Sequence, residues 1–306
     1  MLDSPNIQDL RVFLLVAQRL SFSEAAAMLG VSPAYVSKRV GVLEKDLATR
    51  LLHRSTRRVS LTEAGQRVYA SAEKILDDVD QLVQDVSTTK RIPRGTLRVS
   101  SSFGFGRHII SPALSALSRQ YPQLTIRLDL FDHLIDVAAE GFDVDIRIGD
   151  EIAPHLIAKR LANNHRVLCA SPEYLALRGT PKQWSDLASH DCLTIKERDH
   201  PAGLWRLHNA GEAVSIRVKG PLLTNHGEIA VQWALEGRGI VLRSIWDVQN
   251  HLAKGELVRV LPEVSQPANI WAVYPARLDT SAKVRVCVDF LSDYFEAQAL
   301  SEGWSA

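Results

Sequence analysis

The feature that most constrains the fold of this chain is a helix stop followed at once by a helix start, in the run LGVSPAYVSKRVGVLE at residues 29–44. Gly30 favours the left-handed backbone that ends a helix. Ser32 and Pro33 are preferred at the cap and the first position of the next helix. Apolar residues then recur at spacings of 4, 3 and 4, which predicts one buried face made of Val36, Val40, Leu43 and Leu47.

Helical patterns also precede this turn. One apolar face is formed by Leu10, Phe13, Leu14 and Ala17. Ser21 and Glu24 fit the S-x-x-E capping box of a helix that ends at Gly30. Two helices joined by so short a turn form a helix-turn-helix. The second of them exposes small and basic residues that suit close approach to DNA bases and phosphates, namely Ala34, Ser37, Lys38, Gly41 and Lys45.

Charge is unevenly distributed along the chain. The 306 residues carry a net charge of only +1, and 46% hydrophobic with 23% charged residues indicates an ordinary globular protein of about two domains. Between Ser37 and Arg58, however, seven basic residues are opposed by two acidic ones. Such a patch is the electrostatic footprint expected for phosphate. A solvated charged face is the alternative for any single residue.

A short hairpin is predicted next. Residues 51–54 and 58–61 read as two strands joined by residues 55–57. Arg54, Arg57 and Arg58 lie near its tip, so the hairpin would form a basic wing suited to the DNA backbone or the minor groove.

Residues 21–66 resemble the winged helix-turn-helix of LysR-type transcriptional regulators. They match, in order, the patterns S-F-x-x-A-A-x-x-L, V-S-x-x-x-V-S, L-E-x-x-L, L-x-R and L-T-x-A-G. The resemblance implies that Ser37 and Lys38 approach bases. It implies further that the DNA backbone is held by Ser23, Arg54, Thr56 and Arg58. The chain departs from the family at Pro33, where many members carry a Gln that can read a base. We therefore expect the DNA-binding residues to be Ser23, Ser32, Pro33, Ala34, Ser37, Lys38, Arg54, Thr56, Arg57 and Arg58.

A long helix capped by Thr62 is predicted to follow. Its apolar residues recur at the 3 and 4 spacing of a heptad seam, at Val68, Ala72, Ile75, Val79, Leu82 and Val86. The seam favours a partner helix, and packing on its own domain is the alternative. The resemblance likewise implies a dimerising linker, which would place two heads on a dyad-symmetric double-stranded operator. Residues 90–95 would break the helix as a hinge, and the assembly would be a homodimer or a homotetramer.

The remaining residues alternate between strand-like and helix-like runs, which predicts an α/β domain with a mostly parallel sheet. Expected helices include 108–120, 134–140, 229–236 and 282–297, with strands at 96–100, 124–130, 144–148, 167–170, 192–195, 216–218, 240–242 and 270–274. The runs LRVSSSFGFGRHIISP, EGFDVDIRIGD, VLCASPEYL, HDCL and EGRGIVL resemble the two-lobed, periplasmic-binding-protein-like effector domain of the LysR family.

The resulting domain plan has three parts. We expect a winged helix-turn-helix at 1–62, a linker helix at 63–91 and an effector-binding domain at 92–306. Lobe I of that domain would comprise 92–163 and 269–306, and lobe II would comprise 164–268. The resemblance is closest to members that answer to tartrate- or malate-like organic acids.

An effector site is predicted where strands end and helices begin. Ser100, Ser101 and Ser102 end a strand before Phe103, and hydroxyls with free N–H groups at a helix start suit a carboxylate. A cap and a tight turn are the alternative. Arg147 would either meet an anionic effector or pair with Asp145. The expected effector-binding residues are Ser100, Ser101, Ser102, Phe103, Arg147, Asn225 and His226.

Other functions find little support. The chain has no G-x-S-x-G, H-E-x-x-H or P-loop pattern, so we expect no catalytic residues, metal or cofactor. Three widely spaced cysteines fit small buried residues better than a redox sensor; they are Cys169, Cys192 and Cys287. With no leader-like start and no apolar run of ~18 residues, we expect a cytoplasmic regulator without a membrane partner, rather than a solute-binding protein.

Overall fold

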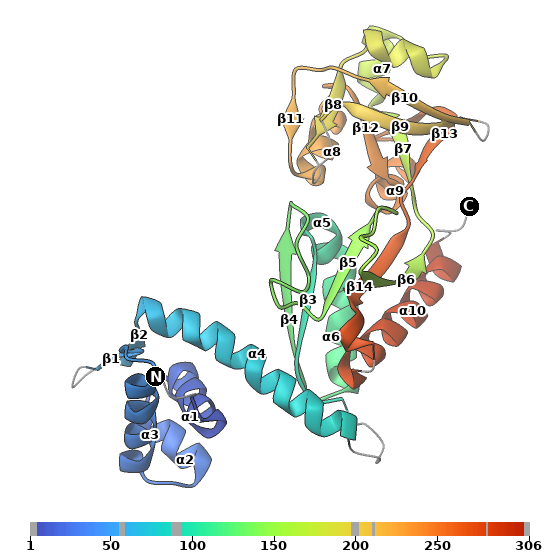
Figure 1. Ribbon diagram of the computed structural model, residues 1–306. Coiled ribbons are helices and arrows are strands. Elements are labelled where there is room, and N and C mark those ends of the chain that lie inside the picture. Colours follow the sequence, from blue (N-terminus) through green and yellow to red (C-terminus); the bar gives the residue numbers. More distant parts are fainter. Residues whose placement is uncertain are drawn as a thin grey trace. The chain divides into compact units, whose positions relative to one another are not determined.

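The computed structural model describes residues 5–54, 59–86, 93–196, 202–209, 212–279 and 281–302. It divides into two compact units, residues 1–91 and residues 92–306 (Figure 1).

The N-terminal unit begins with the predicted helices, α1 (Ile7–Arg19), α2 (Phe22–Leu29) and α3 (Pro33–Asp46). The Ser21 hydroxyl accepts a hydrogen bond from the Glu24 N–H at 3.2 Å, so it caps α2 as predicted. Gly30 has a φ of +65° and its N–H donates to the last carbonyls of α2, which ends that helix. The Ser32 hydroxyl accepts from the Tyr35 N–H at 3.2 Å and begins α3.

The three helices pack around one apolar core. Phe13 of α1 is fully buried with three residues of the predicted face of α3, Val36, Val40 and Leu43, whereas Leu47 caps the helix and is only partly buried. A two-stranded antiparallel hairpin follows, β1 (Leu52–Arg54) and β2 (Val59–Leu61). The Glu44 carboxylate accepts from the backbone N–H groups of Leu51 and Leu52, at 2.9 and 3.2 Å, and so joins α3 to the hairpin. The predicted wing residues Thr56, Arg57 and Arg58 lie outside the described residues.

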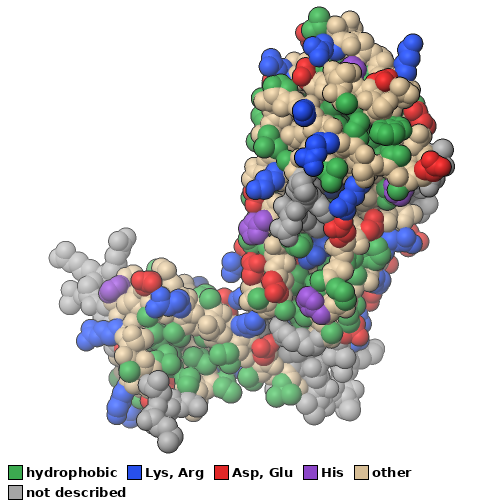
Figure 2. Space-filling model, turned by 45° about the horizontal axis from the view of Figure 1, so that its top comes forward, with side chains coloured by type: hydrophobic (Ala, Val, Ile, Leu, Met, Phe, Trp, Pro, Cys, Tyr) green, Lys and Arg blue, Asp and Glu red, His purple; other side chains and the backbone are tan. Residues whose placement is uncertain are grey.

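Helix α4 (Glu63–Val86) is capped by Thr62, whose hydroxyl accepts from the Gly65 N–H at 2.9 Å. Its predicted seam divides into two parts. Val68 and Ala72 pack into the core of the unit, so the alternative of packing on the chain's own domain holds for the start of the helix. Ile75 and Leu82, in contrast, are 43% and 63% exposed. Figure 2 shows apolar side chains, in green, on the surface of this unit.

In the second unit, lobe I contains a five-stranded sheet in the order β4-β3-β5-β14-β6. Its strands are β3 (Gly95–Ser102), β4 (Leu124–Phe131), β5 (Val144–Ile148), β6 (Leu156–Ala162) and β14 (Ile270–Pro275). β3 runs parallel to β4 and β5, whereas β14 runs antiparallel to β5 and β6. The helices α6 (Ser111–Gln120) and α10 (Ala282–Glu302) contribute apolar side chains to the core of this lobe.

Lobe II contains a seven-stranded sheet in the order β10-β9-β13-β7-β12-β8-β11. Its strands are β7 (His165–Ala170), β8 (Cys192–Ile195), β9 (Leu204–Asn209), β10 (Glu212–Arg217), β11 (Leu223–Thr224), β12 (Ile240–Ser244) and β13 (Val258–Pro267). Its helices are α7 (Pro172–Arg178), α8 (Gly227–Leu235) and α9 (Ile245–Ala253), with short 3-10 turns at Trp184–Ser189 here and at Ala276–Leu278 in lobe I. Only β8 with β11 and β8 with β12 pair in parallel among its described strands. The prediction of mostly parallel sheets is therefore wrong. The strands next to the lobe crossings, β6, β7, β13 and β14, pair antiparallel with their neighbours.

Two local predictions also need correction. Residues 134–140 form turns and not a helix, because the Asp136 carboxylate accepts the N–H groups of Ala138 and Ala139 and closes a tight turn. The helix expected from His108 begins earlier, with α5 (Phe103–Phe105) and a π-helical turn at Gly106–Ile110. Pro112 follows that turn and has no N–H for a regular helical hydrogen bond.

The chain crosses between the lobes at Asn164 and at Ala268. The amide of Asn164 is buried and donates to the Ala268 carbonyl at 2.7 Å and to the Ser244 hydroxyl at 3.2 Å. These bonds tie the two crossings together at the point where lobe I and lobe II meet.

Candidate functional site

The start of α3 is the most exposed part of the helix-turn-helix. Pro33, Ala34, Tyr35 and Lys38 are exposed, whereas Ser37 is half-buried. Ser23 is also exposed, in the first turn of α2. These residues, of which all but Tyr35 are expected to bind DNA, are therefore accessible at the surface of the helix-turn-helix, Ser37 only in part. Of Arg54, the structure describes the backbone position at the end of β1.

One basic residue of the predicted patch is turned inward. Arg39 forms an ion pair with Asp9, whose carboxylate is fully buried at the start of α1. Burial raises the pKa of Asp9, and the Arg39 guanidinium opposes that rise. Arg39 therefore connects α1 to α3, and the charge available to DNA on this helix comes chiefly from Lys38 and Lys45.

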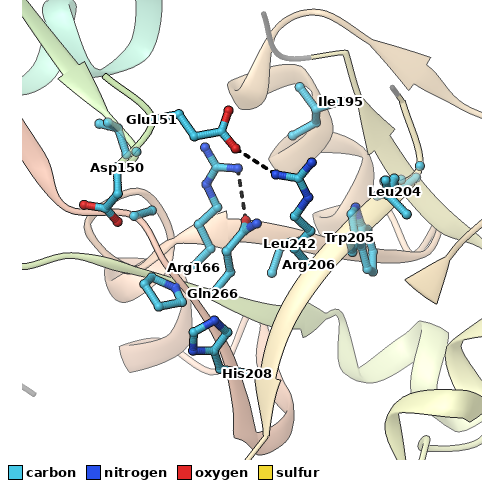
Figure 3. Close-up of a pocket in the computed structure, with 16 residues that line it drawn as sticks. Asp150, Glu151, Arg166, Ile195, Leu204, Trp205, Arg206, His208, Leu242 and Gln266 are labelled. Atoms are coloured by element: carbon cyan, nitrogen blue, oxygen red, sulfur yellow. Dashed lines mark hydrogen bonds and ion pairs between the residues drawn. The ribbon is translucent and has the colours of Figure 1, made fainter. Parts of the chain in front are cut away.

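One interlobe cavity measures about 390 Å³ (Figure 3). Lobe I contributes Asp150 and Glu151 to its lining, from the loop after β5. Lobe II contributes polar and aromatic side chains from β7, β9 and β13, namely Arg166, Trp205, Arg206, His208 and Gln266. Figure 3 shows Arg166 and Arg206 extending from separate strands toward Glu151.

The polar groups of this cavity contact one another within each lobe and, at one pair, across the lobes. Arg206 Nη1 lies 2.7 Å from Glu151 Oε1, so lobe II holds a carboxylate of lobe I. Arg166 donates to the Gln266 side chain at 3.2 Å. The Asp150 carboxylate accepts from Asn269 Nδ2 at 2.9 Å and from the Trp271 indole N–H at 2.8 Å. The cavity thus presents the guanidinium groups of Arg166 and Arg206, and Arg206 is bound to the carboxylate of Glu151.

A smaller compartment of about 90 Å³ lies at the end of β3. It shares Ile148 and Arg166 with the larger cavity. Four of the residues predicted to bind the effector line it: Ser101, Ser102, Phe103 and His226. Ser102 stands at the cap of α5, yet its hydroxyl makes no capping hydrogen bond. The Phe103 and His226 rings approach to 5.5 Å between centroids, across the two lobes.

The other predicted effector residues, and Ser101 among the four above, have internal partners. The hydroxyl of Ser100 is buried and donates to Asp145 at 2.9 Å, and the Ser101 hydroxyl donates to the Ile146 carbonyl at 2.9 Å. Arg147 is 2% exposed, and its Nη2 lies 2.6 Å from Asp145 Oδ2. The structure thus favours the second interpretation of Arg147, in which it pairs with Asp145 and not with an anionic effector. Asn225 donates to the Asp132 carboxylate of lobe I.

Sequence reasoning missed Arg166 and Arg206. β9 lies beside β13, and β13 lies beside β7, so the two arginines are neighbours only in the folded sheet. The available signal is the alternation in β9, where the fully buried Leu207 separates Arg206 and His208, both exposed. That alternation places the two polar side chains on one face of the strand.

A second set of charges bridges the lobes beside the smaller compartment. Glu228, in the first turn of α8, accepts hydrogen bonds from Arg107 and lies 2.8 Å from His108 Nε2. Burial alone would raise the pKa of Glu228, but the hydrogen bonds from His108 and Arg107 outweigh it and lower that pKa. Glu228 is therefore held ionised between two basic residues of lobe I.

The cysteines and the helices restrict other functions. Cys169, Cys192 and Cys287 are buried, and burial raises the pKa of each thiol to about 12. Within the described ranges, no group of three His, Cys, Asp or Glu residues is placed to hold a metal ion. Nor does any helix among them have the length and apolar character needed to cross a membrane.

A helix-turn-helix head joined to a two-lobed domain with a polar interlobe cavity defines a DNA-binding regulator with a ligand-binding module. Comparison with known proteins makes the class specific. Residues 7–66 match the bacterial regulatory helix-turn-helix proteins of the lysR family, and residues 90–296 match the LysR substrate binding domain. The chain belongs to the LysR family of transcriptional regulators, as its sequence motifs predict.

Individual relatives extend over nearly the whole chain. The HTH-type transcriptional regulator DmlR of Escherichia coli K12 is 57% identical over 291 residues, covering 95% of each chain. The HTH-type transcriptional activator TtdR of the same strain is 51% identical over 288 residues, covering 94% of this chain and 93% of its own. These relatives are regulators and not enzymes, so the chain is a regulator as well.

Solved structures show the same fold. The full-length virulence activator AphB of Vibrio cholerae aligns with a TM-score of 0.59 and 28% identity, covering 95% of this chain and 99% of its own. CrgA of Neisseria meningitidis, a LysR-type regulator, aligns with a TM-score of 0.58 and 31% identity over the same shares. The predicted architecture of a winged helix-turn-helix followed by a two-lobed α/β domain is therefore confirmed.

Proposed function

We propose that this regulator is controlled by a small organic anion bound between lobes I and II. The observation that carries the proposal is the pair of guanidinium groups, Arg166 and Arg206, that line one interlobe cavity. Guanidinium groups bind carboxylates through paired, charge-assisted hydrogen bonds. A cavity of about 390 Å³ also falls in the range of small-molecule sites.

The proposed ligand contacts both lobes. One carboxylate would take the place of Glu151 on Arg206 and lie near Arg166. The rest of the ligand would reach Ser102, Phe103 and His226 in the smaller compartment, which opens beside Arg166. The wall of this compartment would be stabilised by hydrogen bonds within lobe I that involve Ser100, Ser101 and Arg147. Asn225 of lobe II would contribute through its hydrogen bond to Asp132, which lines the compartment.

Binding would be coupled to lobe closure. The ligand replaces an interlobe ion pair, so it stabilises a different set of contacts between lobe I and lobe II. A coupling free energy of about 1–3 kcal/mol is typical of allosteric regulators. We infer that this difference is passed to the DNA-binding heads through the linker helix.

The proposed assembly is a homodimer or homotetramer on DNA in the cytoplasm. The exposed residues Ile75 and Leu82, with Val79 between them, continue the heptad seam beyond the part of α4 that packs on the head. A partner helix would cover this row and place two heads on a dyad-symmetric operator. Each head would present Ser37 and Lys38 to bases and Ser23, Ser32, Pro33 and Ala34 to the surrounding groove, with Arg54, Thr56, Arg57 and Arg58 on the wing.

A thermal-shift screen of the full-length protein against small organic acids tests the ligand. A ligand at 100 times its dissociation constant stabilises the folded state by about 2.7 kcal/mol. Arg166→Ala and Arg206→Ala should each lose the shift. Arg217→Ala, which removes an exposed arginine of β10 outside the cavity, should keep it. A shift that survives both cavity substitutions would refute the assignment of the site.

A further inference from the structure

The first turn of the recognition helix carries an exposed aromatic side chain that the motif comparison does not assign. Tyr35 is the third residue of α3 and is 41% exposed, although its neighbour Val36 is fully buried in the head. Aromatic rings offer a large apolar surface with a polar end. Tyr35 is the aromatic residue among the exposed residues of this turn, beside Pro33 and Ala34.

The position of Tyr35 is held by the helix cap. Its N–H donates to the Ser32 carbonyl at 3.0 Å and to the Ser32 hydroxyl at 3.2 Å. Tyr35 and Lys38 are three residues apart, so they lie on the same edge of α3. Both are exposed, so Tyr35 shares this edge of α3 with the basic residue expected to reach the bases.

The chemistry of this turn suits an apolar partner. Pro33 and Ala34 have no side-chain donors or acceptors, so the first turn cannot read bases through hydrogen bonds from those positions. In the major groove, apolar side chains recognise the C5-methyl group of thymine. A tyrosine ring at the start of the recognition helix offers that surface, in continuity with the DNA-binding face of the family.

We propose that Tyr35 is a specificity-determining residue that packs its ring against a thymine methyl group in the operator. Hydrogen bonding then comes from Ser37 and Lys38, and the apolar contact fixes one A·T pair. The inference rests on DNA binding by the helix-turn-helix and adds one contact to it. Binding of DNA by the variants distinguishes failure of this contact from failure of DNA binding as a whole.

The test uses full-length protein and a duplex that the wild type selects from random DNA. Dissociation constants are measured for wild type, Tyr35→Gln, Tyr35→Phe and Ile7→Ala, before and after deoxyuridine replaces each thymine in the footprint. Deoxyuridine removes only the methyl group. Ile7 is an exposed apolar residue of α1 and serves as the control.

At one thymine position, wild type, Tyr35→Phe and Ile7→Ala should each lose about fourfold in affinity on deoxyuridine, the loss that corresponds to one buried methyl group. Tyr35→Gln should bind the thymine duplex more weakly and show no further loss. Two results would overturn the proposal. One is an equal loss of affinity on deoxyuridine in Tyr35→Gln and wild type. The other is a Tyr35→Phe variant that binds DNA as weakly as Tyr35→Gln, which would assign the contact to the hydroxyl and a phosphate. Circular dichroism confirms that each variant is folded.

Discussion

His108 Nε2 of lobe I lies 2.8 Å from Oε1 of Glu228 in lobe II, and Arg107 binds the same carboxylate. His108 and Arg107 project from a π-helical turn, and π-helical turns are often found at functional sites. Ile148 and Arg166 line both the smaller compartment and the larger cavity. In the larger cavity, Glu151 of lobe I pairs with Arg206 of lobe II. Ionic contacts thus join the two lobes beside each compartment, from Arg107 and His108 to Glu228 at the smaller one and between Arg206 and Glu151 at the larger one.

Glu228→Gln should lower stability at neutral pH by about 1–2 kcal/mol, because it removes charged hydrogen bonds between the lobes. The folded-state pKa of Glu228 lies below its ordinary value, so its ionised form stabilises the folded protein. That contribution is complete above the unfolded-state pKa, about 4.3, and disappears as the pH falls through the lowered folded-state pKa. Urea unfolding of wild type and variant should therefore converge in strong acid.

Glu263→Gln is the matched control, since Glu263 is an exposed lobe II residue outside both compartments. It should leave stability unchanged at either pH. A Glu228→Gln deficit that persists undiminished in acid would contradict the ionic interpretation.

Glu151→Gln should raise affinity for the anion, because the internal carboxylate no longer competes for Arg206. Both side chains of this pair are more than half exposed, so the gain should be a few-fold, corresponding to less than about 1 kcal/mol. Asp289→Asn breaks a comparable exposed pair with Lys159, away from the cavity, and should have no effect. Calorimetric titration with the acid found in the screen measures both. Weaker binding by Glu151→Gln would show that Glu151 supports the ligand instead of competing with it.

Arg39→Ala should destabilise the head by about 3–5 kcal/mol, the cost of leaving a buried carboxylate without its partner. Asp9 is fully buried and its pKa is already raised by burial, so protonation in acid should relieve part of the loss. Thermal unfolding at pH 7 and pH 4 measures the difference, with the exposed Arg50→Ala as the control. An Arg39→Ala variant with normal stability but weak DNA binding would show that Arg39 contributes to DNA binding and not to the stability of the head.

The three cysteines should be inert in the folded protein. Burial raises each thiol pKa to about 12, so the reactive thiolate is scarce at neutral pH. A thiol reagent should label none of them in the native state and all three in denaturant. DNA binding that changes with peroxide would restore the redox-sensor alternative.

The parts of the fold that were predicted correctly depend on local signals. The caps at Ser21 and Ser32 and the stop at Gly30 act within a few residues, so the helix-turn-helix follows directly from the sequence. The helix expected at 134–140 fails because Asp136 binds its own backbone, a competition that hydrophobic spacing does not reveal.

The cavity depends on long-range pairing. Arg166 and Arg206 belong to β7 and β9, which are separated in the sheet by β13 from much later in the chain. Ser100 and Arg147 were expected in the cleft because they end strands or alternate along them. Instead, Asp145 binds both, since it lies opposite Ser100 of β3 and two residues before Arg147 on β5.

A crystal structure of the full-length protein with the stabilising acid tests the central claim most directly. The proposal predicts a carboxylate within hydrogen-bonding distance, about 3 Å, of both Arg166 and Arg206, with Glu151 displaced from Arg206. An acid bound outside the interlobe cavity, or bound there with the Glu151–Arg206 pair intact and neither arginine in contact, would contradict it.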